Sequence, residues 1–324
     1  MKKIAALLAC VLCLVLVASL ATAETVKIAV IYSDTVDDKG WCQTMDTGIK
    51  NAQNMGYDIE YTPVESVAIS DASNVLDQLA GDYDIIIVHG AQFGTACQEK
   101  AEEYPDQVFA MGTSDQVLGD NIFTYMPMSE EPGYVNGVIA GLITKNNKIG
   151  IVGSAKGGDS IRYVCGFILG VQSVNAEAAE QIMQSWTGSY SDTVGAGDIG
   201  KTFVEAGCDT LVGPAQQAVG ALRVVDSADG VLWIAQTMSQ MEDFPNVTVA
   251  AADYDYSAVV IELINRTAAG EKGGVCIPLN YNNGGFVYAF SDMLSDDVKA
   301  AAQSALDAFK DASNTIDIST VSLD

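Results

Sequence analysis

Basic residues are scarce in this sequence. Its 324 residues include 16 lysines and arginines against 42 aspartates and glutamates, which gives a formal net charge of -26 at pH 7. A negative field of this strength repels phosphate backbones and anionic lipid headgroups. The composition therefore argues against nucleic acid and anionic membrane surfaces as partners.

Histidine and closely paired cysteines are also missing. His89 is the only histidine, so no second imidazole is available for a metal site. Of the seven cysteines, two lie in the apolar N-terminal segment, and no C-x-x-C pair occurs. The others are Cys42, Cys97, Cys165, Cys208 and Cys276. Their spacing predicts neither a disulfide framework nor a zinc site. We expect most of these cysteines to be small core residues. One disulfide among them is the alternative.

No catalytic or cofactor-binding motif is complete. His89 has no G-x-S-x-G serine as a partner. Residues 195–200 match G-x-G-x-x-G by letter, but the preceding predicted strand ends well before them, and Asp198 would repel a pyrophosphate. Residues 153–160 have Asp159 where a P-loop needs lysine. The sequence therefore predicts a protein that is not an enzyme and holds no cofactor and no metal.

Long apolar runs are confined to the N-terminus. A short basic start is followed by an almost continuously apolar stretch over residues 4–20 and by an A-x-A site at residues 21–23. We expect residues 1–23 to be a cleavable signal peptide and the mature protein to be periplasmic or extracellular. A lipid anchor at Cys10 is not favoured, because too few apolar residues precede it. No later segment has the roughly 18 apolar residues of a spanning helix.

Strand-like and helical patterns alternate along the rest of the chain, which is typical of mostly parallel sheets. The expected strands are 26–32, 58–62, 85–88, 108–111, 121–125, 148–153, 182–186, 210–212, 231–235, 276–279 and 286–290. The expected helices are 43–54, 72–79, 96–103, 131–145, 165–174, 199–206, 218–225 and 257–267. The fold class is therefore α/β, with a mostly parallel sheet flanked by helices in each of two lobes.

We expect the chain to cross between the lobes several times, because no Pro-rich or Ser-rich linker separates the two halves. We assign residues 24–126 with 252–272 to the N-terminal lobe. We assign residues 127–251 with 273–324 to the C-terminal lobe. In such a protein a small ligand binds in the cleft between lobes, and closure is a hinge motion.

The segment 36–52 indicates where that ligand would be bound. It follows the first predicted strand and places acidic residues, a glycine and Trp41 before an amphipathic helix. Open α/β sheets present ligand-binding side chains at this carboxyl edge. Binding of a small molecule is therefore the first functional hypothesis.

Several motifs follow one another in a characteristic order: the K-I-A-V-I-Y strand, D-x-G-W at 38–41, and residues 62–67, 135–141, 144–152, 166–175 and 185–192. Together they resemble the basic membrane protein family of ABC transporter substrate-binding proteins. The resemblance covers essentially the whole chain after the signal peptide. It implies a type I periplasmic-binding-protein fold that delivers a purine base or nucleoside to an ABC transporter permease.

The resemblance also implies ligand-binding residues in the first lobe. Trp41 matches an aromatic residue of the family and Phe93 resembles a second one, and each would stack on a purine. Asp38 matches the family's acidic residue and would accept hydrogen bonds from a base or a ribose. Each residue also has a structural alternative. Trp41 and Phe93 could pack within the protein, and Asp38 could cap the helix that follows it.

Further candidates lie later in the chain or beside the third strand. Trp186 follows a predicted strand of the second lobe and either faces the cleft or packs on the core. Asp115 fits the family pattern only with a shift. His89 ends the third strand and either donates to a ligand or is a hydrogen-bonded loop residue.

The chain departs from the nucleoside-binding members after residue 235. Those members often have G-V-D-x-D-Q there, whereas this chain reads Q-T-M-S-Q over residues 236–240 and so lacks two ribose-binding carboxylates. Residues 252–257 resemble a branch that takes free bases, with Tyr256 in place of a tryptophan. Gln236 and Thr237 would then bind the edge of a base. The departures favour a purine base over a nucleoside.

The expected function is capture of a purine between two lobes by a monomer, followed by delivery to the permease. A sugar or other small polar ligand is the alternative within binding, because Trp41 could also stack on a pyranose. A sensory module that presents its closed form to a chemoreceptor or kinase is the alternative from another class. The sequence does not distinguish transport from signalling.

Overall fold

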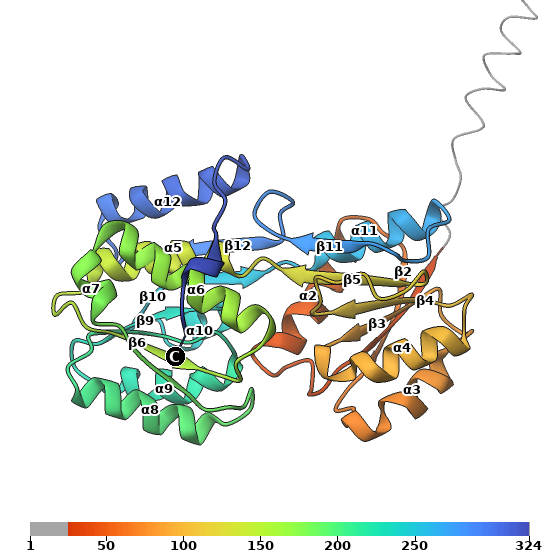
Figure 1. The fold of residues 1–324 in the computed structure, drawn as a ribbon, viewed down its shortest axis with the longest axis horizontal. Coiled ribbons are helices and arrows are strands. Elements are labelled where there is room, and N and C mark those ends of the chain that lie inside the picture. Colours follow the sequence, from red (N-terminus) through yellow and green to blue (C-terminus); the bar gives the residue numbers. More distant parts are fainter. Residues whose placement is uncertain (1–24, 324) are drawn as a thin grey trace, which may run out of the picture.

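Two six-stranded sheets form two lobes that lie side by side in the computed structural model, which describes residues 25–323 (Figure 1). The first sheet has the order β11-β5-β4-β3-β1-β2, and all of its pairings are parallel. Its strands are β1 (Val26–Ile31), β2 (Ile59–Val64), β3 (Ile85–His89), β4 (Val108–Gly112), β5 (Ile122–Pro127) and β11 (Cys276–Leu279). The helices of this lobe are α2 (Trp41–Asn54), α3 (Ala72–Leu79), α4 (Gly94–Glu103) and α11 (Ser257–Ala268).

The second sheet has the order β12-β10-β9-β8-β6-β7 and is parallel except for the pair of β10 with β12. Its strands are β6 (Ile149–Gly153), β7 (Met183–Trp186), β8 (Thr210–Val212), β9 (Leu232–Ala235), β10 (Thr248–Tyr254) and β12 (Phe286–Phe290). Its helices are α5 (Glu130–Ile143), α6 (Gly158–Val174), α7 (Ala176–Glu180), α8 (Thr193–Glu205), α9 (Val219–Asp226), α10 (Met238–Asp243) and α12 (Asp296–Lys310). The predicted α/β class with two mostly parallel sheets is confirmed.

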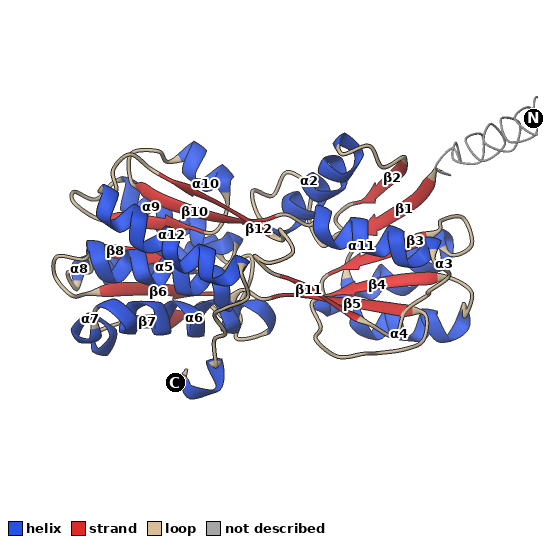
Figure 2. Cartoon of the chain, turned by 90° about the horizontal axis from the view of Figure 1, so that it is seen from above, coloured by secondary structure: helices blue, strands red, loops and turns tan. Residues whose placement is uncertain are grey.

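The chain crosses between the lobes three times, from β5 to α5, from β10 to α11 and from β11 to β12 (Figure 2). Several short crossings were predicted from the missing linker. The position of β11 differs from the predicted boundary at residue 273, because β11 pairs with β5 and so lies in the first lobe. The other predicted boundary, at residue 252, falls inside β10, which belongs wholly to the second sheet.

Buried apolar runs explain why the central strands form. All five residues of β3 are buried, as are all five of β4 and of β6. Strands covered by helices on both faces need apolar side chains on both faces. In the first lobe α2 and α11 cover one face and α3 and α4 cover the other. In the second lobe α5, α6 and α12 cover one face, and α8 and α9 cover the other.

Helices α5 and α6 approach each other closely because glycines lie along their contact. A Cβ at Gly137 would lie 2.1 Å from the carbonyl oxygen of Phe167, and one at Gly170 would lie 2.1 Å from the carbonyl oxygen of Tyr134. No side chain fits in that space, because such contacts are far inside van der Waals distance. The G-rich motifs at 135–141 and 166–175 therefore serve helix packing rather than ligand binding.

All five cysteines in the described part of the chain are free thiols. Four of them are buried, as predicted for small core residues, and Cys276 is half-buried. No helix among residues 25–323 is both long enough and apolar enough to span a bilayer. The predicted signal peptide lies outside the described residues.

Candidate functional site

A cleft of about 570 Å³ separates the two lobes and is lined by residues of both. The first lobe contributes the segments that follow β1, β2, β3 and β4, together with the start of α2. The second lobe contributes the segments after β6, β7, β8 and β9, and the last residue of β10. The carboxyl ends of parallel strands thus face each other across one cavity, which is where open α/β sheets bind ligands.

Trp41 forms the aromatic wall of the cleft on the first lobe. It is the first residue of α2, and its indole stacks on the ring of His89 with centroids 4.4 Å apart and an interplanar angle of 9°. Its Nε1 donates to the carbonyl oxygen of His89 at 3.3 Å. Edge contacts with Tyr254 and Tyr256 hold the ring from the side. Trp41 is therefore a positioned surface on which a flat ligand could stack.

His89 supports Trp41 from behind and is itself fully buried. Its Nε2 lies 3.0 Å from the carbonyl oxygen of Trp41, which can only accept, so Nε2 carries the proton. Its Nδ1 then accepts from the hydroxyl of Tyr125 at 2.7 Å. Burial lowers the pKa of His89 to about 3, so the ring is neutral at physiological pH. Both ring nitrogens are occupied within the protein.

The second lobe contributes a chain of three polar side chains to the cleft. The amide Nε2 of Gln236 donates to the hydroxyl oxygen of Tyr254 at 2.7 Å. That hydroxyl donates to Oδ2 of Asp159 at 3.0 Å. Burial raises the pKa of Asp159 to about 6. All three residues line the cleft, and they come from the ends of β9 and β10 and from the first turn of α6.

The cleft is almost free of formal charge. Among the described residues that line it, Asp159 is the only one with a charged side chain, and none is lysine, arginine or histidine. The other polar groups are amides and hydroxyls, such as those of Gln92, Thr113 and Gln240. Such a surface suits a neutral ligand with several hydrogen-bonding groups, because it offers no cation to an anionic one.

The two lobes touch at the rim of the cleft. Gly40, before α2, lies so close to the second lobe that a Cβ there would be 2.6 Å from Cβ of Gln216. Lys39 forms a 3.8 Å ion pair with Asp243 of α10. A Cβ at Gly158 would lie 3.1 Å from the hydroxyl of Thr113. These contacts describe a closed arrangement of the lobes.

Three of the nine predicted site residues line the cleft: Trp41, Gln236 and Thr237. Gln236 and Thr237 directly follow β9, and Trp41 begins α2 after the loop that follows β1. Gln236 and Thr237 are 5% and 6% exposed, so a ligand would contact them only inside the closed cavity.

Asp38 and Phe93 do not line the cleft, and the structural alternative explains each. The carboxylate of Asp38 accepts from the backbone N–H groups of Gly40, Cys42 and Gln43 at 2.9 to 3.1 Å. It therefore caps the start of α2. Phe93 is 1% exposed and packs among α3 and α4. The turn after β3 directs its ring inward, away from the ligand side.

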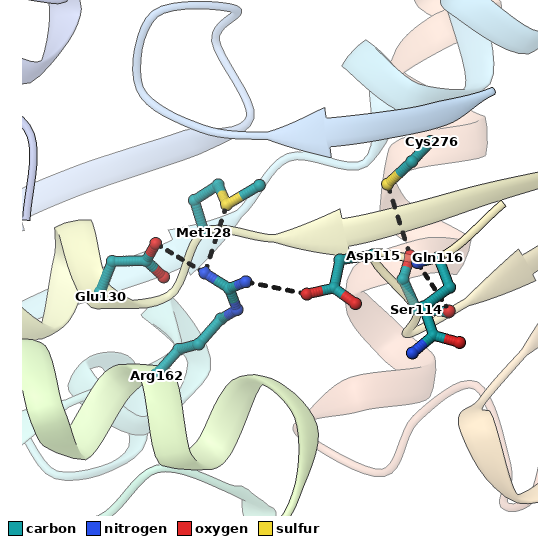
Figure 3. Close-up of polar contacts among 7 residues, drawn as sticks. All are labelled: Ser114, Asp115, Gln116, Met128, Glu130, Arg162 and Cys276. Carbon is teal, nitrogen blue, oxygen red and sulfur yellow. Dashed lines mark hydrogen bonds and ion pairs between the residues drawn. The ribbon is translucent and has the colours of Figure 1, made fainter. Parts of the chain in front are cut away.

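Asp115 also lies outside the cleft lining, at the contact between the lobes. Its carboxylate is 3.2 Å from an amino group of Arg162 in α6, and the same guanidinium binds Glu130 at 2.8 Å (Figure 3). Met128, at the crossing from β5 to α5, places its sulfur 3.6 Å from Arg162. Asp115 thus joins the first lobe to the second beside a crossing.

Trp186 and Tyr256 are the other two predicted aromatics, and neither lines the cleft. The ring of Trp186 packs on the backbone of Gly153, where a Cβ would lie 2.4 Å from it. Tyr256 is fully buried, and its ring lies 5.6 Å from Trp41 and 5.1 Å from His89. It supports the aromatic wall from within the core. His89 has the same role.

Asp159, Tyr254 and Gln92 line the cleft but were not predicted as site residues. The signal for Asp159 was present, since it follows the loop after a predicted strand. Tyr254 ends β10, a strand that was not predicted. Gln92 follows Gly90, which has a φ of 152°, a backbone conformation that residues with a side chain rarely adopt. This glycine allows the turn that brings Gln92 to the cleft.

Two lobes of parallel sheet, three crossings and a cleft between opposed strand ends define a protein of the periplasmic-binding type. A solute-binding protein of an ABC transporter system from Conexibacter woesei has the same fold. The TM-score is 0.74 at 19% identity, over 90% of this chain and 99% of that one. The chain belongs to the Bmp family, described as ABC transporter substrate-binding protein PnrA-like, whose model matches residues 25–307. The predicted family and fold are confirmed.

Two relatives are matched by sequence over part of their length. A candidate glucose-binding protein of an ABC transporter from Haloferax volcanii is 32% identical over 68% of this chain and 55% of its own length. The match thus spans little more than half of that relative. A purine-binding protein of Brucella abortus is 24% identical over 86% of this chain and 79% of its own length.

Proposed function

We propose that this protein binds a purine, and a free base in preference to a nucleoside, between its lobes and presents the closed form to an ABC transporter permease. The observation that carries the proposal is the cleft itself. It brings the ring of Trp41 together with the amide of Gln236 and the hydroxyl of Thr237. A purine base needs one aromatic contact for its face and polar partners for its edge.

The purine-binding relative from Brucella abortus supports this ligand class. A free base is favoured because Asp159 is the only carboxylate among the described residues of the cleft wall, whereas ribose binding by this family is expected to use more than one. The missing carboxylates after residue 235 point the same way. Export by a signal peptide at residues 1–23 and action as a monomer complete the proposal.

Closure would exclude water from the ligand. In the closed arrangement Gln236 and Thr237 are nearly inaccessible, so a ligand must enter while the lobes are apart. The three crossings offer the flexible connection for such a motion. The permease would then distinguish the closed from the open form by the relative position of the two lobes.

A sugar is the second candidate, because the relative from Haloferax volcanii is named for glucose binding. Trp41 could stack on a pyranose as well as on a purine. The amides and hydroxyls of the cleft could also bind the ring hydroxyls of a sugar, so titration with both kinds of ligand is needed to distinguish the two candidates.

Calorimetry tests both candidates. The purified protein would be titrated with adenine, hypoxanthine, xanthine, guanine, their nucleosides and glucose. We expect binding of at least one purine base, more tightly than of its nucleoside. Absence of heat with every purine at millimolar concentration would sink the purine proposal, and binding of glucose alone would establish the sugar. Mass spectrometry of small molecules released on denaturation would identify a ligand retained through purification.

A further inference from the structure

Asp159 occupies an unusual position in the cleft. It is the only charged side chain among the described lining residues, yet it belongs to the first turn of α6 and is half-buried. A carboxylate in a helix first turn is favoured by the helix dipole. That effect does not require the carboxylate to line a cavity, so its position there needs a second explanation.

The hydrogen bonds around Asp159 leave it as an acceptor only. Gln236 donates to Tyr254, and Tyr254 donates to Oδ2 of Asp159, so the chain of donors ends on the carboxylate. Ser129 lies 3.3 Å from the same tyrosine hydroxyl, and since that hydroxyl gives its proton to Asp159, Ser129 is the donor. An ionised carboxylate can accept about four hydrogen bonds. The backbone N–H groups of Asp159 and Ser160 also donate to this carboxylate. Asp159 thus keeps acceptor capacity for about one further donor in the cleft.

The nearest cations of the second lobe are engaged elsewhere. Arg162, one turn further along α6, binds Glu130 and Asp115 at 2.8 and 3.2 Å. Lys156 lies over the ring of Trp186, with its Nζ 5.3 Å from the ring centroid. No ion pair forms between Asp159 and a cation within the described residues. Arg162 acts on Asp159 only through its Coulomb field, so the negative charge is not neutralised by direct contact and also acts on the cleft.

We propose that Asp159 determines which ligands the cleft accepts: its carboxylate takes hydrogen bonds from N–H donors on the ligand edge and rejects anionic ligands of the same shape. This inference rests on the proposed binding of purines and adds a selection rule. Neutral bases such as hypoxanthine present ring N–H donors and should bind. Urate, a purine that is an anion at neutral pH, and nucleotides should be excluded.

The selection has a simple electrostatic origin. Hydrogen bonds to a charged acceptor are stronger than those between neutral groups. Inside a closed cleft the same charge repels an anion with little screening by water. One carboxylate thus strengthens the binding of one group of ligands and weakens that of the other, which a merely structural residue could not do.

The test compares hypoxanthine with urate on the full chain and its Asp159→Asn variant, by calorimetry at about pH 8, above the pKa of about 6 of Asp159. We expect the ratio of the urate to the hypoxanthine dissociation constant to fall at least tenfold in the variant, because a charged hydrogen bond and a repulsion are both lost. Asp198→Asn, an exposed position of α8 in the same lobe, is the matched control and should leave the ratio unchanged.

A second variant separates charge from structure. Tyr254→Phe removes the hydroxyl that donates to Asp159 but leaves the carboxylate, so urate should remain excluded. An unchanged ratio in Asp159→Asn, or equal weakening of both ligands, would overturn the inference while purine binding stands. If the natural protein binds no purine at all, both this inference and the proposed function are refuted.

Discussion

Gly40 allows a direct test of whether the closed form is the binding form. A Cβ at this position would lie 2.6 Å from Cβ of Gln216 and 3.6 Å from its Cα, both in the opposite lobe. Non-bonded carbon atoms prefer separations of about 3.5–4.0 Å. An alanine at residue 40 would thus push the lobes apart by roughly 1 Å at this contact.

The expected effect of Gly40→Ala follows from that overlap. Overpacking of this size destabilises a structure by about 1–3 kcal/mol. Here it destabilises only the closed form, because the contact between Gly40 and Gln216 exists only when the lobes meet. Ligand affinity should fall by about five- to 150-fold. The ligand-free protein can open to relieve the overlap, so its thermal unfolding should change little.

Calorimetry with the bound purine and thermal unfolding without it would measure the two quantities. Gln216→Gly removes the opposing Cβ, so the double variant should recover part of the lost affinity, and a double-mutant cycle isolates this coupling. Gly119→Ala is the matched control, because its Cβ would meet atoms of Ile122 no closer than 3.5 Å. Unchanged affinity in Gly40→Ala, or additive effects in the cycle, would refute the reasoning.

Two further predictions concern the aromatic wall and the response to pH. Trp41→Ala should weaken purine binding at least tenfold, since stacking on a base is worth about 1–3 kcal/mol. Trp41→Phe should retain most of the affinity. Equal losses of affinity in both variants, measured by calorimetry, would mean that Trp41 is not stacked on the ligand. Burial raises the pKa of Glu131 to about 7, from 4.5. The folded protein therefore binds a proton that the unfolded chain releases, and this group makes the fold more stable as pH falls from above 7 towards 4.5. Glu131→Gln can still accept from the N–H of Tyr281, and we expect it to raise the free energy of unfolding by about 1–2 kcal/mol at high pH. Its free energy of unfolding in urea should also depend less steeply on pH. A pH dependence equal to that of the natural protein would contradict this prediction.

The fold was largely predictable because its central strands are buried on both faces. Runs such as Ile85–His89 read as strands without further information, and the missing linker indicated repeated crossings. The strand Thr248–Tyr254 was missed, since three of its seven residues are alanine, which is not a strong strand former. The placement of β11 depends on its pairing with β5, which local sequence does not determine.

The sequence predicted the location of the candidate site better than the residues that line it. Strand ends pointed to the cleft between the lobes, and Trp41, Gln236 and Thr237 line that cleft. Which way a side chain points after a strand depends on the helix packed against it. Phe93 and Tyr256 were directed into the core by such packing, and pattern alone cannot show that. Asp159 was read only as a residue that a P-loop would not tolerate.

The three crossings also have a consequence for folding. The first sheet gains its edge strand β11 only at residues 276–279, long after β5 ends at residue 127. The first lobe is thus incomplete until most of the chain is available, and neither lobe corresponds to one continuous fragment. Pairings between such distant segments make folding slow and leave an unpaired strand edge exposed in the meantime. We therefore expect truncation before residue 276 to impair the N-terminal lobe, although all of its other strands are present.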